Sequence, residues 1–308
     1  MNQPAREQKA PHIYRNFAMD STRWENFKPR EGDIIICTPP KCGTTWTQMI
    51  CALLIFQKTK FDKPLSDYTP WLDMTIAPID KVLALFEAQT HRRFIKTHTP
   101  FDGLPYYTQV TYLCVGRDPR DVFMSMDNHG GNMNPEFMMR MAQNMKSGDK
   151  LPSPQIKDLR ERFRVWIAAS GSPETCENPM MMPVQPYIKS FWDYRHLPNI
   201  HMLHYSDMKR DLDGVMRNLA KMLGISVPEN LWPQLVAAAQ FENMKQNADM
   251  LAPDAKVGIW RDPGNFFNKG ESGQWRDVLG PDELAAYEKT MRELPADLAE
   301  WIEKGSLG

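Results

Sequence analysis

The sequence predicts an α/β fold with three layers, in which helices flank a mostly parallel β-sheet. Short apolar runs bounded by turn residues are typical of strands buried on both faces, and amphipathic segments with a helical period alternate with these runs. In addition, a polar loop containing Lys, Gly and Thr joins the first run to a helix. This P-loop-like strand–loop–helix is typical of phosphate binding.

The expected elements follow in order along the chain. Strands are expected at residues 34–37, 94–97, 110–115 and 200–205, and the first strand leads into a helix at 47–58. The segment 211–223 shows the helical period best, because its apolar side chains fall on one face. These side chains are Leu212, Val215, Met216, Leu219, Met222 and Leu223. Gly224 is placed to end this helix.

The 308 residues are expected to form one domain, 1–308. Residues 1–30 are interpreted as an irregular lead-in. Residues from about 128 to 182 are rich in Met, Pro, Gly and Ser around a helical segment near 159–169. We interpret them as a lid or lobe over the functional site.

Composition excludes several classes of protein. The chain has 37 Lys and Arg against 38 Asp and Glu, and 42% of its residues are hydrophobic, which argues against a disordered chain and a generic nucleic-acid binder. Its apolar stretches are far shorter than the ~20 residues of a membrane span, and its amino terminus has no signal-peptide pattern. The five cysteines show neither a disulfide framework nor a zinc spacing. We therefore expect a reduced, cytoplasmic protein.

Polar groups follow every expected strand. In an open parallel sheet, ligands bind beyond the carboxyl ends of the strands, so these groups are expected to meet. In strand order they are Lys41, Gly43, Thr44, Thr45 and Trp46; Lys96 and His98; Arg117 and Ser125; and Tyr205. Cations, hydroxyls and one imidazole at a shared edge predict an anion site with a candidate acid–base group.

The segment PPKCGTTW has the properties of a phosphate cradle. Gly43 lets backbone N–H groups approach an anion, and the helix start adds a positive dipole. Lys41 supplies a charge, and Thr44 and Thr45 supply hydroxyl donors. The segment is not a Walker motif, because its lysine precedes the glycine.

Several segments resemble the cytosolic-type sulfotransferases that use 3′-phosphoadenosine 5′-phosphosulfate (PAPS). PPKCGTTW resembles that family's PPKSGTTW, KTHTP its KTHLP, and GRDPRDVFMS its RNPKDVAVS. The segments HYSDMKRDLDGVMRNLAKMLGI, FENMKQN and FFNKGESGQWRD continue the resemblance in the family's order over residues 34–277. The resemblance implies transfer of a sulfuryl group from PAPS to a hydroxyl or amine, with PAP as the product.

The resemblance also implies roles for single residues. Lys41, Cys42, Gly43, Thr44 and Thr45 match the 5′-phosphosulfate loop, and Trp46 matches the residue that packs on adenine. Arg117 and Ser125 match the ligands of the 3′-phosphate. Tyr205 and Phe241 match adenosine contacts, and Lys269 and Gly270 match the end of the RKG motif.

The chemistry of sulfuryl transfer agrees with these positions. A neutral hydroxyl is a poor nucleophile and needs a base within hydrogen-bond reach, a role that suits His98. Charge develops on the bridging oxygen as the phosphate–sulfate bond breaks, and Lys41 and Lys96 are the candidates to stabilise it. We expect no metal, since cations and loop amides can take its place.

The chain departs from the family pattern at a few positions. Asn268 replaces the first residue of RKG, so we expect weaker PAPS binding unless Lys256, Arg261 or Arg276 compensates. Cys42 replaces a serine; either its thiol pKa is lowered at the helix start, or only its backbone N–H binds. The family's dimerisation segment is not recognisable in WRDVLGPDEL, so a homodimer through that segment is in doubt.

Trp71, in YTPWLDM, and His129, in NHGGN, are candidates for the acceptor pocket. Loops rich in Met, Phe and Trp predict an apolar small-molecule acceptor such as a phenol, sterol, alcohol or lipid-like hydroxyl. Two other functions stay open: a catalytically inactive PAPS- or PAP-binding regulator, and a P-loop kinase. The kinase reading requires a Walker lysine and metal-binding carboxylates, which this sequence lacks.

Overall fold

The fold was analysed in a computed structural model. It describes residues 11–16, 18–143, 156–169, 183–253, 257–267 and 269–306. Asn268 and Lys256 lie outside these ranges, as does much of the predicted lobe at 128–182.

The centre of the fold is a sheet of four parallel strands in the order β2-β1-β3-β4. The strands are β1 (Ile34–Cys37), β2 (Phe94–Thr97), β3 (Thr111–Gly116) and β4 (Ile200–His204). Their limits agree with the predicted runs to within one residue. The predicted α/β class and parallel pairing are confirmed.

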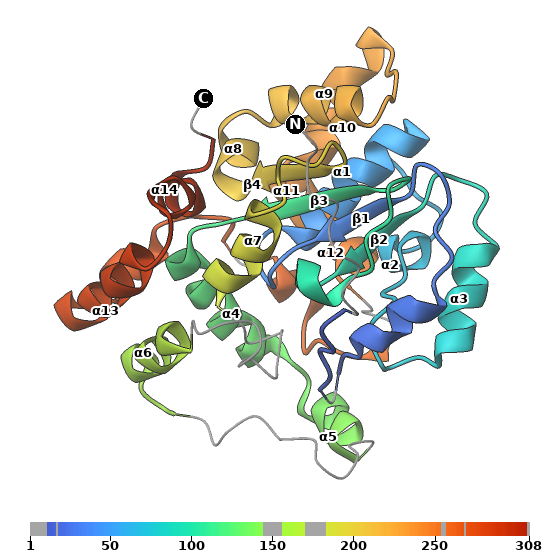
Figure 1. The fold of residues 1–308 in the computed structure, drawn as a ribbon. Coiled ribbons are helices and arrows are strands. Elements are labelled where there is room, and N and C mark those ends of the chain that lie inside the picture. Colours follow the sequence, from blue (N-terminus) through green and yellow to red (C-terminus); the bar gives the residue numbers. More distant parts are fainter. Residues whose placement is uncertain are drawn as a thin grey trace.

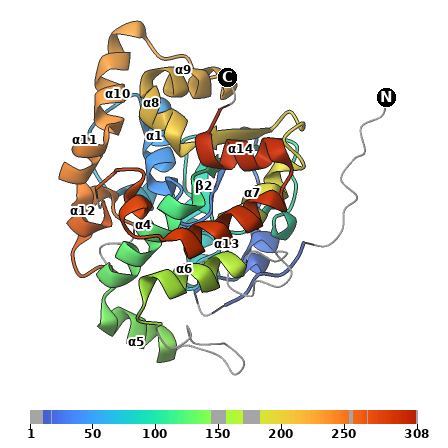
Figure 2. The ribbon, with the colours of Figure 1, turned by 90° about the vertical axis from the view of Figure 1, so that its left-hand side faces the viewer.

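Alternate residues of the strands face two separate hydrophobic cores. Ile34 and Ile36 of β1 pack on one side with α1 (Thr44–Phe56), and Ile35 and Cys37 pack on the other with α7 (Val184–Trp192). Because successive side chains of a strand point to opposite faces, an unbroken apolar run requires cover on both sides. Figures 1 and 2 show the sheet between its two layers of helices.

The remaining α-helices, apart from α5, each belong to one of these two cores. The core on the α1 side includes α2 (Leu65–Tyr68), α8 (Tyr205–Arg210), α9 (Leu212–Met222), α10 (Trp232–Ala239), α11 (Phe241–Gln246) and α12 (Ala248–Leu251). The core on the α7 side includes α3 (Ile79–Glu87), α4 (Pro119–Asn132), α6 (Leu159–Ala168), α13 (Pro281–Arg292) and α14 (Ala296–Lys304). Helix α5 (Pro135–Gln143) contributes Phe137 to a small third cluster with Ile259 and Trp260.

Two helices differ slightly from their predicted limits. Helix α1 begins at Thr44 instead of residue 47, because the polar loop passes directly into the helix at Gly43. Helix α9 begins where the Asp211 carboxylate accepts a hydrogen bond from the Gly214 N–H at 2.9 Å. Its carboxyl end is closed by a bond from the Ile225 N–H to the Ala220 carbonyl at 2.8 Å, with Gly224 next in line as predicted.

The described parts of the predicted lobe and lead-in have specific contacts. Helix α6 packs against α13, where Arg164 forms an ion pair with Glu283 and the Arg160 Nε–H donates to the Val278 carbonyl at 2.7 Å. The lead-in contains a short 3₁₀ helix, η1 (Ser21–Asn26), and buries Trp24.

Within the described ranges, no helix has the length and apolar character needed to cross a bilayer.

Candidate active site

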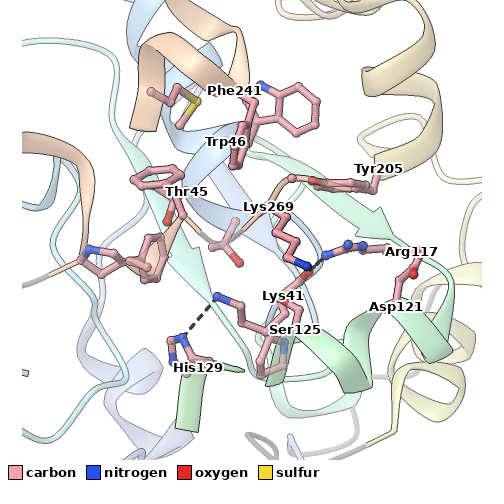
Figure 3. Close-up of a pocket in the computed structure, with 18 of the residues that line it drawn as sticks. Lys41, Thr45, Trp46, Arg117, Asp121, Ser125, His129, Tyr205, Phe241 and Lys269 are labelled. Carbon is pink, nitrogen blue, oxygen red and sulfur yellow. Dashed lines mark hydrogen bonds between the residues drawn. The ribbon is translucent and has the colours of Figure 1, made fainter. Parts of the chain in front are cut away.

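A cavity of about 200 Å³ opens at the carboxyl ends of the four strands (Figure 3). All but one of the predicted site residues line it. They are Lys41, Gly43, Thr44, Thr45, Trp46, Trp71, Lys96, His98, Arg117, Ser125, His129, Tyr205, Phe241, Lys269 and Gly270. The strand-end argument therefore located the cavity correctly.

The loop between β1 and α1 has an unusual backbone that fits a cradle. Lys41 and Gly43 have φ angles of 66° and 100°, both in the left-handed region. A side chain at Gly43 would place its Cβ 3.2 Å from the Tyr205 ring, so glycine also allows close approach here. Among the residues that the structure describes, no side chain caps the start of α1, so its first N–H groups are available to an anion.

Lys41 lies within the cavity among apolar and cationic groups. Its Nζ is 3.2 Å from His129 Nδ1 and 4.5 Å from the centre of the Phe266 ring. Burial, together with the positive charge of Arg117, lowers the pKa of Lys41 to about 7. Burial lowers the pKa of His129 well below its usual range, and the charge of Lys41 adds to this effect. A bound anion would favour the charged form of such a lysine and raise its pKa.

His98 is fixed in one tautomer by its hydrogen bond. Its Nδ1 is 2.7 Å from the Thr38 carbonyl oxygen, which can only accept, so Nδ1 carries the proton and Nε2 keeps a free lone pair. Burial, followed by the charges of Lys96 and Lys41, lowers the pKa of His98 to about 3. The ring is therefore neutral near pH 7.

Trp71 packs against two predicted site residues, Lys96 in β2 and His98 just after it. Its ring is 5.0 Å from that of His98, edge to face, and Lys96 Nζ lies 4.2 Å from its centre. The predicted acceptor-pocket residue thus lies beside the candidate base.

Aromatic side chains form the other end of the cavity. The rings of Trp46 and Tyr205 are 5.3 Å apart, and the Trp46 Nε1–H donates to the Ala239 carbonyl at 2.8 Å. The Arg117 guanidinium lies 4.1 Å from the centre of the Tyr205 ring and donates to the Lys41 carbonyl at 3.0 Å. Together with Phe241, these rings suit a planar base, and Arg117 suits a phosphate next to it.

Cys42 is the one predicted site residue that does not line the cavity. It is fully buried, and burial raises the pKa of its thiol to about 12. The alternative of a lowered thiol pKa is wrong, because burial in an apolar core outweighs the charge of Arg117. The Cys42 N–H is 3.3 Å from the Pro39 carbonyl oxygen and helps to shape the loop.

Some cavity residues were not found from the sequence. They include Lys209, Asp121, Met244, Trp260 and Phe266. Lys209 follows the fourth strand in SDMKRD, so extending the strand-end argument by one helical turn would have found it. Trp260 and Phe266 carry no such signal, because a non-local pairing of Trp260 with Met133 brings their segment to α4.

Of the predicted substitutes for the missing RKG cation, the structure describes two, and neither of them lines the cavity. Arg261 and Arg276 do not line the cavity, whereas Lys209 does, and its Nζ–H donates to the Gly270 carbonyl at 2.8 Å. The Asp121 carboxylate accepts a hydrogen bond from the Gly273 N–H at 2.7 Å and fixes the same loop. Burial raises the pKa of Asp121. The described ranges contain no cluster of three or more His, Cys, Asp or Glu side chains arranged for a metal.

The fold and the cavity define a class: an α/β protein whose strand ends combine a phosphate cradle, an aromatic slot and a neutral histidine. The family model for the sulfotransferase domain matches residues 31–299. The chain belongs to the sulfotransferase family, and it is an enzyme that transfers sulfuryl groups.

Individual relatives agree with this membership. The glycolipid sulfotransferase of Mycobacterium bovis is 36% identical over 311 residues, which cover 96% of this chain and 95% of that protein. Sulfotransferase 1A1 of Rattus norvegicus is 26% identical, with 87% of this chain and 88% of that protein covered. The structure of mouse sulfotransferase SULT7A1 complexed with PAP has a TM-score of 0.67 at 20% identity, covering 91% of this chain and 90% of that one. This last similarity concerns the fold.

Proposed function

We propose that this sulfotransferase takes its sulfuryl group from PAPS and transfers it to a hydroxyl or amine of an apolar small molecule. One observation carries the proposal: His98, whose Nδ1 is bonded to the Thr38 carbonyl, and Lys41 line the same cavity as the aromatic slot. A site that only bound nucleotide would need the slot and the cations but not the base.

The donor end is argued from shape and charge. Lys41, Thr44 and Thr45 would hold the 5′-phosphosulfate at the start of α1. Arg117, Ser125 and Lys269 would hold the 3′-phosphate, with the base between Trp46, Tyr205 and Phe241. The Arg117 Nε is buried and has no partner among the described residues, which fits a guanidinium awaiting an anion.

The transfer step follows from the same positions. His98 accepts the acceptor's proton at Nε2 as the oxygen–sulfur bond forms. Lys41 and Lys96 stabilise the charge left on the phosphate oxygen as its bond to sulfur breaks. Trp71 and the half-buried aromatic wall around His129 exclude water, which would otherwise compete with the acceptor.

The acceptor side is apolar with polar groups at its base. Trp71, Trp260 and Phe266 form its walls, and His129 and His98 lie among them. The closely similar mycobacterial relative is named for glycolipids, so lipid-linked sugars join phenols, sterols and alcohols as candidate acceptors. A cytoplasmic location is part of this proposal.

The first experiment is transfer of labelled sulfate from PAPS to phenols, aliphatic alcohols, sterols and a short-chain glycolipid, with and without EDTA. His98→Ala should lose about 10²- to 10⁴-fold in kcat. His201→Ala is the matched control, because His201 lies on β4 and does not line the cavity. We expect transfer that EDTA does not reduce.

The same experiment decides between the alternatives. If no acceptor is sulfated but calorimetry shows tight PAP binding, the regulator reading gains support. If PAP does not bind, the donor assignment is wrong. If transfer persists unchanged in His98→Ala, the base is another group.

A further inference from the structure

A buried carboxylate lies directly behind the candidate base. Asp73 is 0% exposed and lies in the segment between α2 and α3, two residues after Trp71. Its Oδ2 accepts hydrogen bonds from the Trp24 Nε1–H at 3.2 Å, the Thr99 hydroxyl at 2.7 Å and the Thr97 hydroxyl. All three donors are therefore directed at one oxygen.

Two of these donors flank His98 in the sequence. Side chains alternate along extended backbone, so Thr97 and Thr99 point to one side and His98 to the other, where it lines the cavity. The Thr97 hydroxyl also accepts a bond from the Thr99 N–H at 2.9 Å. One carboxylate thus fixes the backbone on both sides of the base.

Asp73 also connects this strand end to the wall of the acceptor pocket. Its segment carries Trp71, which packs edge to face on His98 and under Lys96 Nζ. The Asp73 carbonyl accepts a bond from the Asp20 N–H at 2.9 Å, and Met74 pairs with Met19, so the segment is held from the lead-in as well. The carboxylate joins three pieces of chain that are distant in sequence.

We propose that Asp73 is a positioning residue for sulfuryl transfer. It holds the side chains of His98 and Trp71 in fixed positions relative to each other. The inference rests on the proposed role of His98 as the base. Asp73 does not line the cavity, so it acts through the hydroxyls of Thr97 and Thr99 and not on the acceptor itself.

The hydrogen bonding of Asp73 indicates which substitution is conservative at this position. Asp73 Oδ1 is buried and accepts no hydrogen bond from the described residues. In Asp73→Asn the amide oxygen can take the place of Oδ2 and keep all three bonds, while the amide nitrogen takes the place of Oδ1. Asp73→Ala removes all three bonds together.

The test measures kcat, acceptor KM and PAP affinity for both variants. Asp73→Ala should lower kcat by about 10- to 100-fold and raise acceptor KM, because small displacements of a base are costly. PAP affinity should stay within about twofold, since the donor loop is separate from Asp73. Asp73→Asn should recover most of kcat.

Two further variants keep the test decisive. Thr99→Val removes one donor at nearly constant volume, and it should lower kcat without changing PAP affinity even if Asp73→Ala does not fold. Asp33→Asn is the matched control, because Asp33 is a carboxylate buried to 1% exposure at the opposite, amino end of β1. It should lose stability and keep kcat.

The outcomes separate this inference from the function on which it rests. Full kcat in folded Asp73→Ala or in Thr99→Val would overturn the positioning role. So would an equal loss in Asp73→Asn and Asp73→Ala, or in Asp33→Asn. If His98→Ala itself keeps full activity, the assignment of the base has failed instead.

Discussion

Asp33 and Arg93 form an ion pair beneath the amino ends of β1 and β2, with side chains 1% and 0% exposed. The Arg93 Nε–H donates to Asp33 Oδ1 at 2.9 Å, and its Nη2 contacts the other carboxylate oxygen and donates to the Lys28 carbonyl at 2.8 Å. The guanidinium also lies 4.8 Å from the centre of the Phe27 ring. The pair joins the two strands at the end opposite the cavity.

Removing one member of this pair should destabilise the fold without affecting the site. Arg93→Met leaves the Asp33 carboxylate buried without its cation, which typically costs about 3–5 kcal/mol. Urea denaturation should show this loss in the free energy of unfolding. PAP affinity at low temperature should match the parent's, and a large change in affinity would contradict the separation of pair and site.

Binding of PAP should take up a proton at Lys41. The Lys41 pKa is about 7 in the free protein, and a neighbouring phosphate favours the charged amine and raises that pKa. Below pH 7 the amine is already charged. Above pH 7, affinity should fall by at most about tenfold per pH unit until the raised pKa is reached.

Calorimetry at pH 8 in two buffers of different ionisation enthalpy measures this uptake. Lys41→Arg is the control, because arginine stays charged throughout and should abolish the proton uptake. Equal heats in both buffers for the parent protein would refute the prediction.

Gly270→Ala should weaken PAP binding by about tenfold. Gly270 has a φ of +66°, and a Cβ there would lie 2.7 Å from the Phe241 ring, so the loop or the ring must move. Gly224→Ala is closely matched, with a φ of +64° and no atom within 4 Å of the added Cβ. It should lower the melting temperature alone. Similar PAP affinities in the two variants would show that the Phe241 contact is unimportant.

Lys209→Ala should weaken binding of PAP by about threefold to tenfold. Lys209 Nζ–H donates to the carbonyl of Gly270, the residue that matches the end of the RKG motif. Adenosine 5′-monophosphate, which has no 3′-phosphate, should lose much less affinity. The exposed Lys221 of α9 provides the control substitution. Equal losses for both nucleotides would place Lys209 away from the 3′-phosphate.

The sequence predicted the strands and the cavity because both follow local rules. An apolar run of four to six residues identifies a buried strand, and the carboxyl ends of parallel strands must share one edge. This brought Lys41, His98, Arg117 and Tyr205 together correctly. The helix start at Thr44 was placed three residues late, because the left-handed backbone at Lys41 and Gly43 carries no periodic signal.

The contacts that tune the site were not predictable from the sequence. His129 meets Lys41 across 88 positions of the chain, and Asp73 meets Trp24 across 49. Each of these contacts depends on packing between two segments that are distant in the sequence. The local pattern of one segment does not predict its contact with the other. The buried state of Cys42 was missed for the same reason, since the core that contains it is built from segments distributed over most of the chain.

The strand order determines when the sheet can form during synthesis on the ribosome. Strand β1 lies between β2 and β3, so one of its edges lacks a partner until Thr97 has been synthesised and the other until Gly116 has been synthesised. The loop that holds Lys41 cannot take its final shape from the first 60 or so residues alone. A nascent chain arrested before β3 should therefore present an apolar strand to chaperones, whereas arrest after β4 leaves the four-stranded sheet free to assemble.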